Sequence, residues 1–267
     1  MSASRCPRGA VVGVGLRPVP LGLSRVPEPD HRAAYAACAL KIKVRCGVPL
    51  ESGGMASCCD PNGLTGMFDE KHARSKARRY RRDGLDAEAR RIVEFLGERI
   101  GGRTVLEVGG GIGAIQLELL RRGASNAENV EISPGYEAVA LDLATERGVA
   151  DRIVRRVADF AVDNASASAA DIVVLNRVVC CYPDMPALVG PAARLTKRWL
   201  VLTFPADRWW VRAGFRTVSA AQALLRSRFR VFFHEPRAIV AAATAAGLRP
   251  LATHRGLVWQ FAALERA

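Results

Sequence analysis

Glycines and acidic residues carry the strongest indication of chemistry in this sequence. Three glycines stand at alternate positions, Gly109, Gly111 and Gly113, directly after an apolar run that contains Glu107. Glycine lets the backbone turn sharply and leaves no Cβ between the main chain and a ligand. The helix expected after the turn begins with unpaired N–H groups, which bind negative or polar groups. The pattern therefore predicts a ligand pocket where a strand turns into a helix.

Two further acids follow, each at the end of a later apolar run. Glu131, followed by Ile132, comes about 20 residues after the glycine turn, which is the spacing of an acid that holds a ribose diol. Asp159 ends the next run, and Phe160 beside it is placed to lie against a purine ring. S-adenosylmethionine has an amine, a ribose diol and an adenine but no phosphates. The three acids therefore favour this ligand, with Glu107 facing its amine.

The glycine turn alone also permits a different ligand. Gly109-x-Gly111-x-x-Ala114 satisfies the dinucleotide fingerprint G-x-G-x-x-G/A, so a nicotinamide or flavin enzyme is an alternative. Glycine patterns of this length arise by chance in a chain with 24 glycines. Dinucleotides carry phosphates, which S-adenosylmethionine lacks. Acids at three successive strand ends therefore favour S-adenosylmethionine over a dinucleotide.

Residues 103–267 resemble a class I S-adenosylmethionine-dependent methyltransferase. The resemblance rests on motif I, the ribose-binding acid, the adenine-side acid and the fourth strand, which correspond to Glu107-x-Gly109-x-Gly111-x-Gly113, Glu131, Asp159 and 171–176. It implies S-adenosylmethionine as cofactor, with Tyr80 and Asn176 among the residues that contact it. Two segments, Tyr80–Leu85 and Asn176–Asp184, are loosely similar to the magnesium-protoporphyrin O-methyltransferase group.

The elements that must position these residues alternate along the chain. Apolar periodicity predicts helices over 69–82 and from Asp86 to Gly101, and then five strands joined by helices. The expected strands are 104–108, 129–132, 153–157, 172–176 and 199–204. This alternation predicts an α/β fold with a doubly wound, mostly parallel sheet. Two more strand-like runs, 248–254 and 257–264, predict a closing hairpin, so we expect seven strands with an antiparallel last strand.

The sequence also suggests how the chain is divided. Residues 1–54 are rich in proline and lack a sustained helical or strand period, so we expect an over-extended start or a disordered tail. A transit sequence is disfavoured because prolines interrupt any amphipathic helix there. Residues 55–267 are the methyltransferase domain that the resemblance implies. Within it, the helices of 68–100 are expected to form a lid, and 205–236 is an insertion after the fifth strand.

Composition is typical of a cytoplasmic enzyme. A chain of 267 residues that is 49% hydrophobic can bury one substantial core. No run reaches the roughly 18 apolar residues of a membrane span. Seven cysteines, an odd number, do not fit a secreted disulfide framework. The adjacent pairs Cys58-Cys59 and Cys180-Cys181 lack the C-x-x-C spacing of zinc sites, so we expect no metal.

The net charge of +13 is unevenly spread. Residues 191–267 contain 13 basic residues and three acids, and 71–82 contain seven bases and no acid. A basic surface favours anionic acceptors, nucleic acid or anionic lipid. The alternative is an arginine-rich proteome in which arginine replaces lysine. The insertion combines two tryptophans, four phenylalanines and six arginines, which suits a flat anionic acceptor or aromatics that pack on one another.

Methyl transfer needs alignment of nucleophile, methyl group and sulfur more than a reactive side chain. No catalytic residue is therefore secure, although Tyr182 is placed to line the methyl pocket and His234 to take a proton. His234 also lies just before a helix start at Pro236, which would give it a structural role. The favoured function is methylation of a small anionic or aromatic acceptor. The alternatives are an RNA or protein methyltransferase and a non-catalytic partner subunit, with nucleic acid not favoured and the oligomeric state left open.

Overall fold

The computed structural model describes residues 63–267. The predictions for residues 1–54 and for the Cys58-Cys59 pair lie outside these residues. From Gly63 onward, helices and strands alternate in the order that the sequence indicates.

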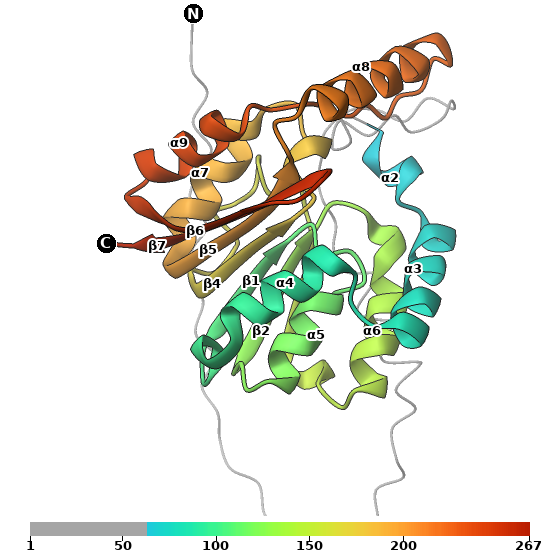
Figure 1. Ribbon diagram of the computed structural model, residues 1–267. Helices are drawn as coiled ribbons and strands as arrows, with labels where there is room; N and C mark the ends of the chain where they lie inside the picture. Colours follow the sequence, from blue (N-terminus) through green and yellow to red (C-terminus); the bar gives the residue numbers. More distant parts are fainter. Residues whose placement is uncertain (1–62) are drawn as a thin grey trace, which may run out of the picture. The chain divides into compact units, whose positions relative to one another are not determined.

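A seven-stranded sheet forms the centre, in the order β3-β2-β1-β4-β5-β7-β6 (Figure 1). The strands are β1 Thr104–Val108, β2 Asn126–Glu131, β3 Ile153–Val157, β4 Ala170–Asn176, β5 Thr196–Pro205, β6 Leu248–Arg255 and β7 Trp259–Arg266. All pairs from β3 to β5 are parallel, whereas β7 runs antiparallel to both β5 and β6. This confirms the doubly wound sheet and its closing hairpin.

Strand β2 begins three residues earlier than the sequence predicts. Its first residues, Asn126 to Glu128, pair with the start of β1 although two of them are polar. The Glu128 carboxylate is buried, but it accepts hydrogen bonds from Arg156 at 2.6 Å and from the backbone N–H of Ser168 at 3.1 Å. A buried charge is tolerated when it is paired and hydrogen-bonded in this way. Apolar periodicity could not indicate these residues as strand.

Helices cover both faces of the sheet (Figure 1). Those on one face are α3 Glu70–Asp83, α4 Ala87–Leu96, α5 Ala114–Arg121 and α6 Glu137–Glu146; those on the other are α7 Met185–Leu195 and α9 Pro236–Ala245. Successive strand residues point to opposite faces. Ile172 and Val174 of β4 accordingly pack in the first core, and Val173 and Leu175 in the second.

The N-terminal helices begin at the predicted signals, and α3 also ends at its own. The Asp69 carboxylate accepts from the backbone N–H of His72 at 2.8 Å and caps α3, and Gly84 ends the helix. Ala73, Ala77 and Tyr80 form its buried face. Asp86 caps α4 through the N–H of Ala89. Helix α4 ends at Leu96 rather than near Gly101, because Gly97 has a φ of 31° and the chain continues as the 3-10 turn Gly97–Ile100.

The insertion after β5 forms helix α8, Trp209–Leu224, and an irregular segment that returns to α9. Figure 1 shows α8 at the top of the view, extending away from the sheet. The short helix α2, Leu64–Met67, precedes α3. Between residues 63 and 267, no helix combines the length and the apolar character that a membrane crossing requires.

Candidate cofactor and acceptor site

The direction of the chain connections changes between β1 and β4. Strands β2 and β3 lie on one side of β1, whereas β4 and β5 lie on the other. In open α/β sheets the crevice at such a point, outside the carboxyl ends of the strands, is where ligands bind. A pocket of about 280 Å³ lies at this place. The residues predicted for the site that line it are Tyr80, Glu107, Gly109, Gly111, Glu131, Ile132, Asp159, Phe160, Asn176 and Tyr182.

Two predicted residues lie off the pocket wall. Gly113 has a φ of 76° and precedes α5, so it shapes the turn without lining the pocket. His234 lies in the segment after α8, where its Nε2 is 2.9 Å from the backbone carbonyl of Tyr182. The proposed roles of these residues remain predictions.

The glycine turn leaves no room for side chains. A Cβ on Gly109, whose φ is 65°, would lie 2.7 Å from Cγ2 of Val178. A Cβ on Gly110 would lie 2.2 Å from Nδ2 of Asn129 and 2.6 Å from the carboxyl carbon of Glu107. The turn therefore presses directly on β1 and β2. The spacing pattern singled out every second glycine and missed Gly110, the position with the tightest contacts.

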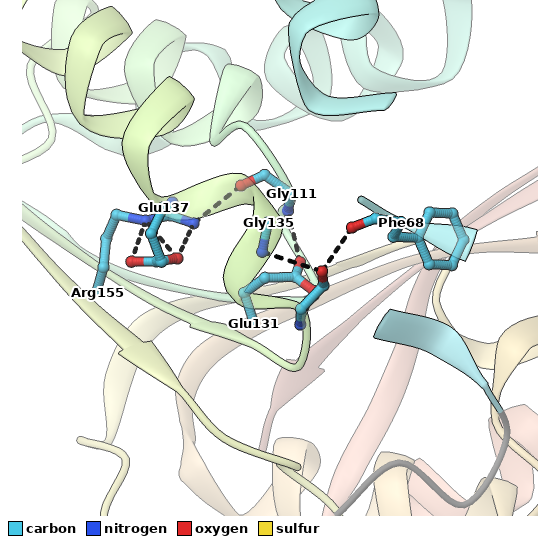
Figure 2. Close-up of polar contacts among 7 residues, drawn as sticks. Phe68, Gly111, Glu131, Gly135, Glu137 and Arg155 are labelled. Carbon is cyan, nitrogen blue, oxygen red and sulfur yellow. Dashed lines mark hydrogen bonds and ion pairs between the residues drawn. The ribbon is translucent and has the colours of Figure 1, made fainter. Parts of the chain in front are cut away.

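Glu131, at the end of β2, is tied to this turn. Its carboxylate accepts from the backbone N–H of Gly111 at 2.9 Å and from the N–H of Ser133 at 3.0 Å. Figure 2 shows Arg155 on the other side, where it donates to the Gly111 carbonyl at 3.0 Å and pairs with Glu137. Burial raises the pKa of Glu131, and the two backbone N–H groups oppose this shift. Each carboxylate oxygen keeps a second lone pair that can accept a ligand hydroxyl.

Glu107 is buried on β1, and its Oε2 has no hydrogen-bond partner within residues 63–267. Burial raises the pKa of Glu107 to about 8, although the backbone N–H of Gln116 and the charge of Arg155 favour the ionised form. A buried polar atom without a partner is costly. An amino group of a ligand would supply the missing donor, so Glu107 fits the amine of S-adenosylmethionine.

Asp159 faces Tyr182 across the pocket. The Tyr182 hydroxyl donates to Oδ2 of Asp159 at 2.9 Å, and the N–H of Ala161 donates to Oδ1 at 3.0 Å. Burial, together with the hydrogen bond to Asp159, raises the pKa of Tyr182 to about 12. Tyr182 is therefore a hydrogen-bond donor at neutral pH. The ring of Phe160 is buried beside these residues.

The lid side of the pocket comes from α3 and the start of α4. Lys76, Arg79 and Tyr80 line it from α3. The Tyr80 hydroxyl donates to Glu118 at 2.8 Å, and the guanidinium of Arg147 lies 5.1 Å from the centre of its ring. The hydroxyl of Tyr80 is therefore already bonded within the protein, and only the rest of the side chain is open to a ligand.

Arg177 connects this lid to the end of β4. It has a φ of 59°, which is uncommon for a residue with a side chain. One guanidinium nitrogen lies 3.2 Å from the carboxylate of Asp86, the other pairs with Glu88, and the group stacks 4.9 Å from the ring of Trp259. Arg177 also lines the pocket. Strained residues held by several contacts occur often at ligand sites.

A family model described as a methyltransferase domain matches residues 77–254, which contain β1 to β5 and almost the whole pocket. The chain belongs to the methyltransferase family. This confirms the predicted enzyme class and S-adenosylmethionine as the cofactor. A comparison of the sequence with curated proteins gives no match.

Solved structures share the fold of this methyltransferase at low identity. Magnesium protoporphyrin IX methyltransferase from Synechocystis with bound SAH has a TM-score of 0.62 and 18% identity, over 78% of this chain and 100% of that chain. A putative sarcosine dimethylglycine methyltransferase from Galdieria sulphuraria has a TM-score of 0.58 and 13% identity, over 74% and 98%. Geranyl diphosphate C-methyltransferase from Streptomyces coelicolor has a TM-score of 0.52 and 18% identity, over 67% and 78%.

The cysteine pair of the methyltransferase follows β4. Cys180 is buried, and Cys181 lines the pocket. Their sulfur atoms lie 3.9 Å apart as thiols, 3.6 Å and 3.7 Å from the carbonyl oxygen of Arg177. Residues 63–267 hold no group of three or more histidine, cysteine and acidic side chains arranged to bind a metal ion.

Several residues of this pocket were not predicted from the sequence. They include Leu64, Phe68, Lys76, Arg79, Gly110, Tyr136 and Arg177. The basic run in α3 was visible, but apolar periodicity does not tell which of its residues turn inward. The insertion, whose aromatic and arginine residues suggested acceptor recognition, contributes none of the residues that line the pocket.

Proposed function

We propose that this enzyme transfers a methyl group from S-adenosylmethionine to a small anionic or aromatic acceptor, bound between α3 and the carboxyl end of β4. The cofactor would lie over β1, β2 and β3, with its amine at Glu107, its ribose at Glu131 and its adenine beside Asp159 and Phe160. The rest of the pocket is then left for the acceptor. Its wall there contains Phe68, Lys76, Arg79, Asn176, Arg177, Cys181 and Tyr182.

The observation that carries this proposal is the state of Lys76. Lys76 makes no hydrogen bond or ion pair within residues 63–267, although it lines the pocket. The residue is exposed as a whole, yet desolvation of its ammonium and, second, the charge of Arg177 lower the pKa of Lys76. Asp86 and Glu131 oppose this shift. A carboxylate or phenolate on the acceptor would form with Lys76 the ion pair that residues 63–267 do not provide.

Methyl transfer requires the side chains of the pocket mainly to bind and align the cofactor and the acceptor. S-adenosylmethionine supplies an electrophilic methyl group on a sulfonium. The residues of the pocket have to hold the acceptor in line with that methyl group and exclude water. This alignment supplies most of the rate enhancement in such transfers. An acceptor carboxylate needs no general base, because it is already ionised. The side chain of Asn176, which would help to align the acceptor, is itself fixed by the hydroxyl of Thr203, which donates to Oδ1 of Asn176 at 2.6 Å.

A role in methylating nucleic acid is less well supported. The basic run in α3 suggested a cationic surface, but four of its arginines pair with acids. Arg74, Arg79, Arg81 and Arg82 lie within 4.0 Å of Glu70, Asp83, Glu146 and Asp83. This leaves few unpaired charges on α3 for a phosphate backbone.

The proposal is tested in two steps. Thermal shift and calorimetry should show binding of S-adenosylmethionine and S-adenosylhomocysteine and no binding of NAD(H). Methyl transfer is then measured with carboxylate and phenol acceptors and with their neutral analogues. Lys76→Met should raise the KM of anionic acceptors while the affinity for S-adenosylmethionine stays unchanged. Arg78→Met is the matched control, because Arg78 is an exposed base on α3 that does not line the pocket. Equal effects of the two variants would contradict an anion site at Lys76.

A further inference from the structure

Helix α8 presents apolar residues to solvent. Only Val211 of this helix is buried. Trp209 is 76% exposed, Leu224 85% and Leu225, directly after the helix, 78%. These residues lie at the two ends of the helix, so the exposure of apolar side chains is not confined to one end. Exposed apolar patches of this kind mark interaction surfaces.

The pattern along the helix makes the side that contains Trp209 and Leu224 largely apolar. Residues spaced by three, four or seven share a face of a helix. The uncharged positions that share the side of Trp209 and Leu224 are Trp210, Ala213, Gly214, Thr217, Ala220 and Ala221, and all are exposed; Arg216, seven residues after Trp209, lies at the border of this side. A surface helix ordinarily turns its charged residues outward. On α3 the outward side is indeed basic, so α8 differs from a helix of the same protein.

Arginines surround this apolar side, which we call the α8 face (Trp209, Trp210, Ala213, Gly214, Thr217, Ala220, Ala221, Leu224 and Leu225). Residues 208–234 contain six arginines and no acidic residue. Arg216, Arg226 and Arg228 are exposed, and no ion pair is formed by them in the described part of the chain. Tryptophan and leucine on one side of a helix, with basic residues beside them, are typical of helices that lie in a membrane interface.

The hairpin between β6 and β7 extends the α8 face. Leu257 is 76% exposed and Val258 47% exposed at the tip of this hairpin. The indole Nε1 of Trp210 donates to the carbonyl oxygen of Leu257 at 3.3 Å, so the two surfaces adjoin. The guanidinium of Arg208 lies 5.0 Å from the ring centre of Trp210. Apolar side chains from two separate segments therefore form one exposed surface with cations at its border.

We propose that the α8 face docks the protein on an anionic lipid surface. Trp209, Leu224 and Leu257 would enter the headgroup region, and the bordering arginines would bind lipid phosphates. A second copy of the chain fits less well, because a two-fold contact over this face would bring one border of arginines against another. A bilayer provides both the apolar layer and the negative charge, and it requires no shape complementarity from a convex helix.

This surface is connected to the pocket. Phe229, in the segment that follows α8, packs edge to face on Phe68 with ring centres 5.6 Å apart, and Phe68 lines the pocket. A Cβ on Gly63 would lie 2.7 Å from the Cβ of Arg228, so the residue before α2 also touches this segment. Docking by α8 would thus hold the lid side of the pocket close to the membrane. The docking itself does not depend on which acceptor is methylated.

The test is flotation of the full chain with lipid vesicles. We expect binding to vesicles of phosphatidylcholine with about one third phosphatidylglycerol, weak binding to phosphatidylcholine alone, and release at high salt. Trp209→Ser combined with Leu224→Ser should lower the affinity for anionic vesicles at least about tenfold, because two large apolar side chains no longer enter the interface. Arg216→Glu combined with Arg228→Glu should do the same. All four side chains are exposed, so melting temperatures should not change.

Matched controls separate the α8 face from net charge and general hydrophobicity. Val162→Ser changes an apolar residue that is 79% exposed in the loop after β3, and Arg78→Glu reverses a charge on α3. Neither should alter vesicle binding. The proposal is overturned if the protein does not bind anionic vesicles, or if the Trp209/Leu224 variant binds them with the affinity of the wild type. It is also overturned if light scattering shows a dimer that this variant dissociates, since the face would then belong to a second copy.

Discussion

Glu131 and Gly111 are joined by a hydrogen bond of 2.9 Å from the backbone N–H of Gly111 to the Glu131 carboxylate. The carbonyl of the same glycine accepts from Arg155, so a residue at the end of β2 and a residue on β3 hold one glycine of the turn after β1 between them (Figure 2). The carboxylate proposed to bind the ribose therefore also fixes the turn after β1. Substitutions at Glu131 should affect the ligand and the loop together.

The first prediction concerns this carboxylate. Glu131→Gln keeps the size of the side chain but replaces one acceptor oxygen with an NH₂ group. That group cannot accept from the Gly111 N–H or a ribose hydroxyl, so we expect the affinity for S-adenosylmethionine to fall at least about tenfold. Calorimetry measures this. Glu128→Gln is the control, because Glu128 is a buried acid on the same strand, outside the pocket. It should lower the melting temperature and leave the affinity unchanged; the same loss in both variants would contradict the assignment.

The second prediction concerns the glycine turn. Gly110→Ala would place a Cβ 2.2 Å from Asn129 and 2.6 Å from Glu107, so the turn must move and binding of S-adenosylmethionine should be lost. Gly111→Val should also abolish binding, since Gly111 has a φ of 58° and its Cβ would lie 3.3 Å from the ring of Tyr136. The sequence suggested a clash with the ligand itself, whereas the structure gives the backbone and Tyr136 as the first obstacles.

Gly101→Ala is the matched control for this turn. Within residues 63–267 no atom lies within 4 Å of a Cβ at Gly101, and the backbone of Gly101 is not left-handed. We expect wild-type affinity for S-adenosylmethionine in this variant. Wild-type affinity in Gly110→Ala as well would show that the turn is not part of the cofactor site.

The third prediction concerns pH. In the protein without ligand the pKa of Glu107 is raised to about 8, from an ordinary value of 4.5. Because the folded-state pKa is the higher one, the contribution of Glu107 to stability is present at low pH and is lost as the pH rises through about 8. An ammonium group beside Glu107 favours the ionised carboxylate, so binding should release a proton below pH 8 and affinity should rise with pH, by at most about tenfold per unit.

Calorimetry in buffers of different ionisation enthalpy measures this proton. Glu107→Gln has no proton to release, so its affinity should be lower and independent of pH between about 6 and 8. Proton release that persists in this variant would assign the titration to another group and remove the support for an amine at Glu107.

The sequence predicted the sheet and the acids for a physical reason. Strand ends are set by local apolar runs, and an acid at such an end is brought to the carboxyl edge of a parallel sheet wherever the strand lies. Glu107, Glu131 and Asp159 could therefore be placed before the fold was known. The residues that could be placed from the sequence are therefore those whose position depends only on where one strand ends.

The lid and the insertion depend on packing between distant elements instead. Lys76 lines the pocket because α3 turns Ala73 and Ala77 inward, whereas four arginines of the basic run pair with acids on α3 or α6. Arg177 adopts a conformation that its residue type does not suggest. The aromatic residues of the insertion pack with one another, as Phe215 and Phe233 do at 6.0 Å, pack on the lid side, as Phe229 does on Phe68, or face solvent, as Trp209 does. The composition of the insertion alone could not tell whether its aromatic residues pack within the protein, face solvent or bind an acceptor.

The fourth prediction concerns Arg177. Arg177→Ala removes the ion pairs to Asp86 and Glu88 and the stacking on Trp259, so we expect the free energy of unfolding to fall by about 1–3 kcal/mol. Arg177→Lys keeps the charge but not the planar guanidinium, so its free energy of unfolding should lie between those of the wild type and the alanine variant. Denaturant unfolding measures both. A stability equal to that of the wild type in the alanine variant would mean that the lid is held by its apolar contacts alone.

The last prediction concerns Tyr182 and His234. The sequence suggested that His234 takes a proton from the acceptor, in which case His234→Ala should lower turnover at least about tenfold and leave binding of S-adenosylmethionine intact. The ring of His234 instead contacts the carbonyl of Tyr182 at 2.9 Å and lies off the pocket wall. We therefore expect His234 to act through Tyr182, whose hydroxyl holds Asp159. In that case the effects of His234→Ala and Tyr182→Phe on affinity for S-adenosylmethionine overlap, and the double variant loses less than the product of the two single losses. Independent effects, with turnover lost only in His234→Ala, would restore His234 as the base.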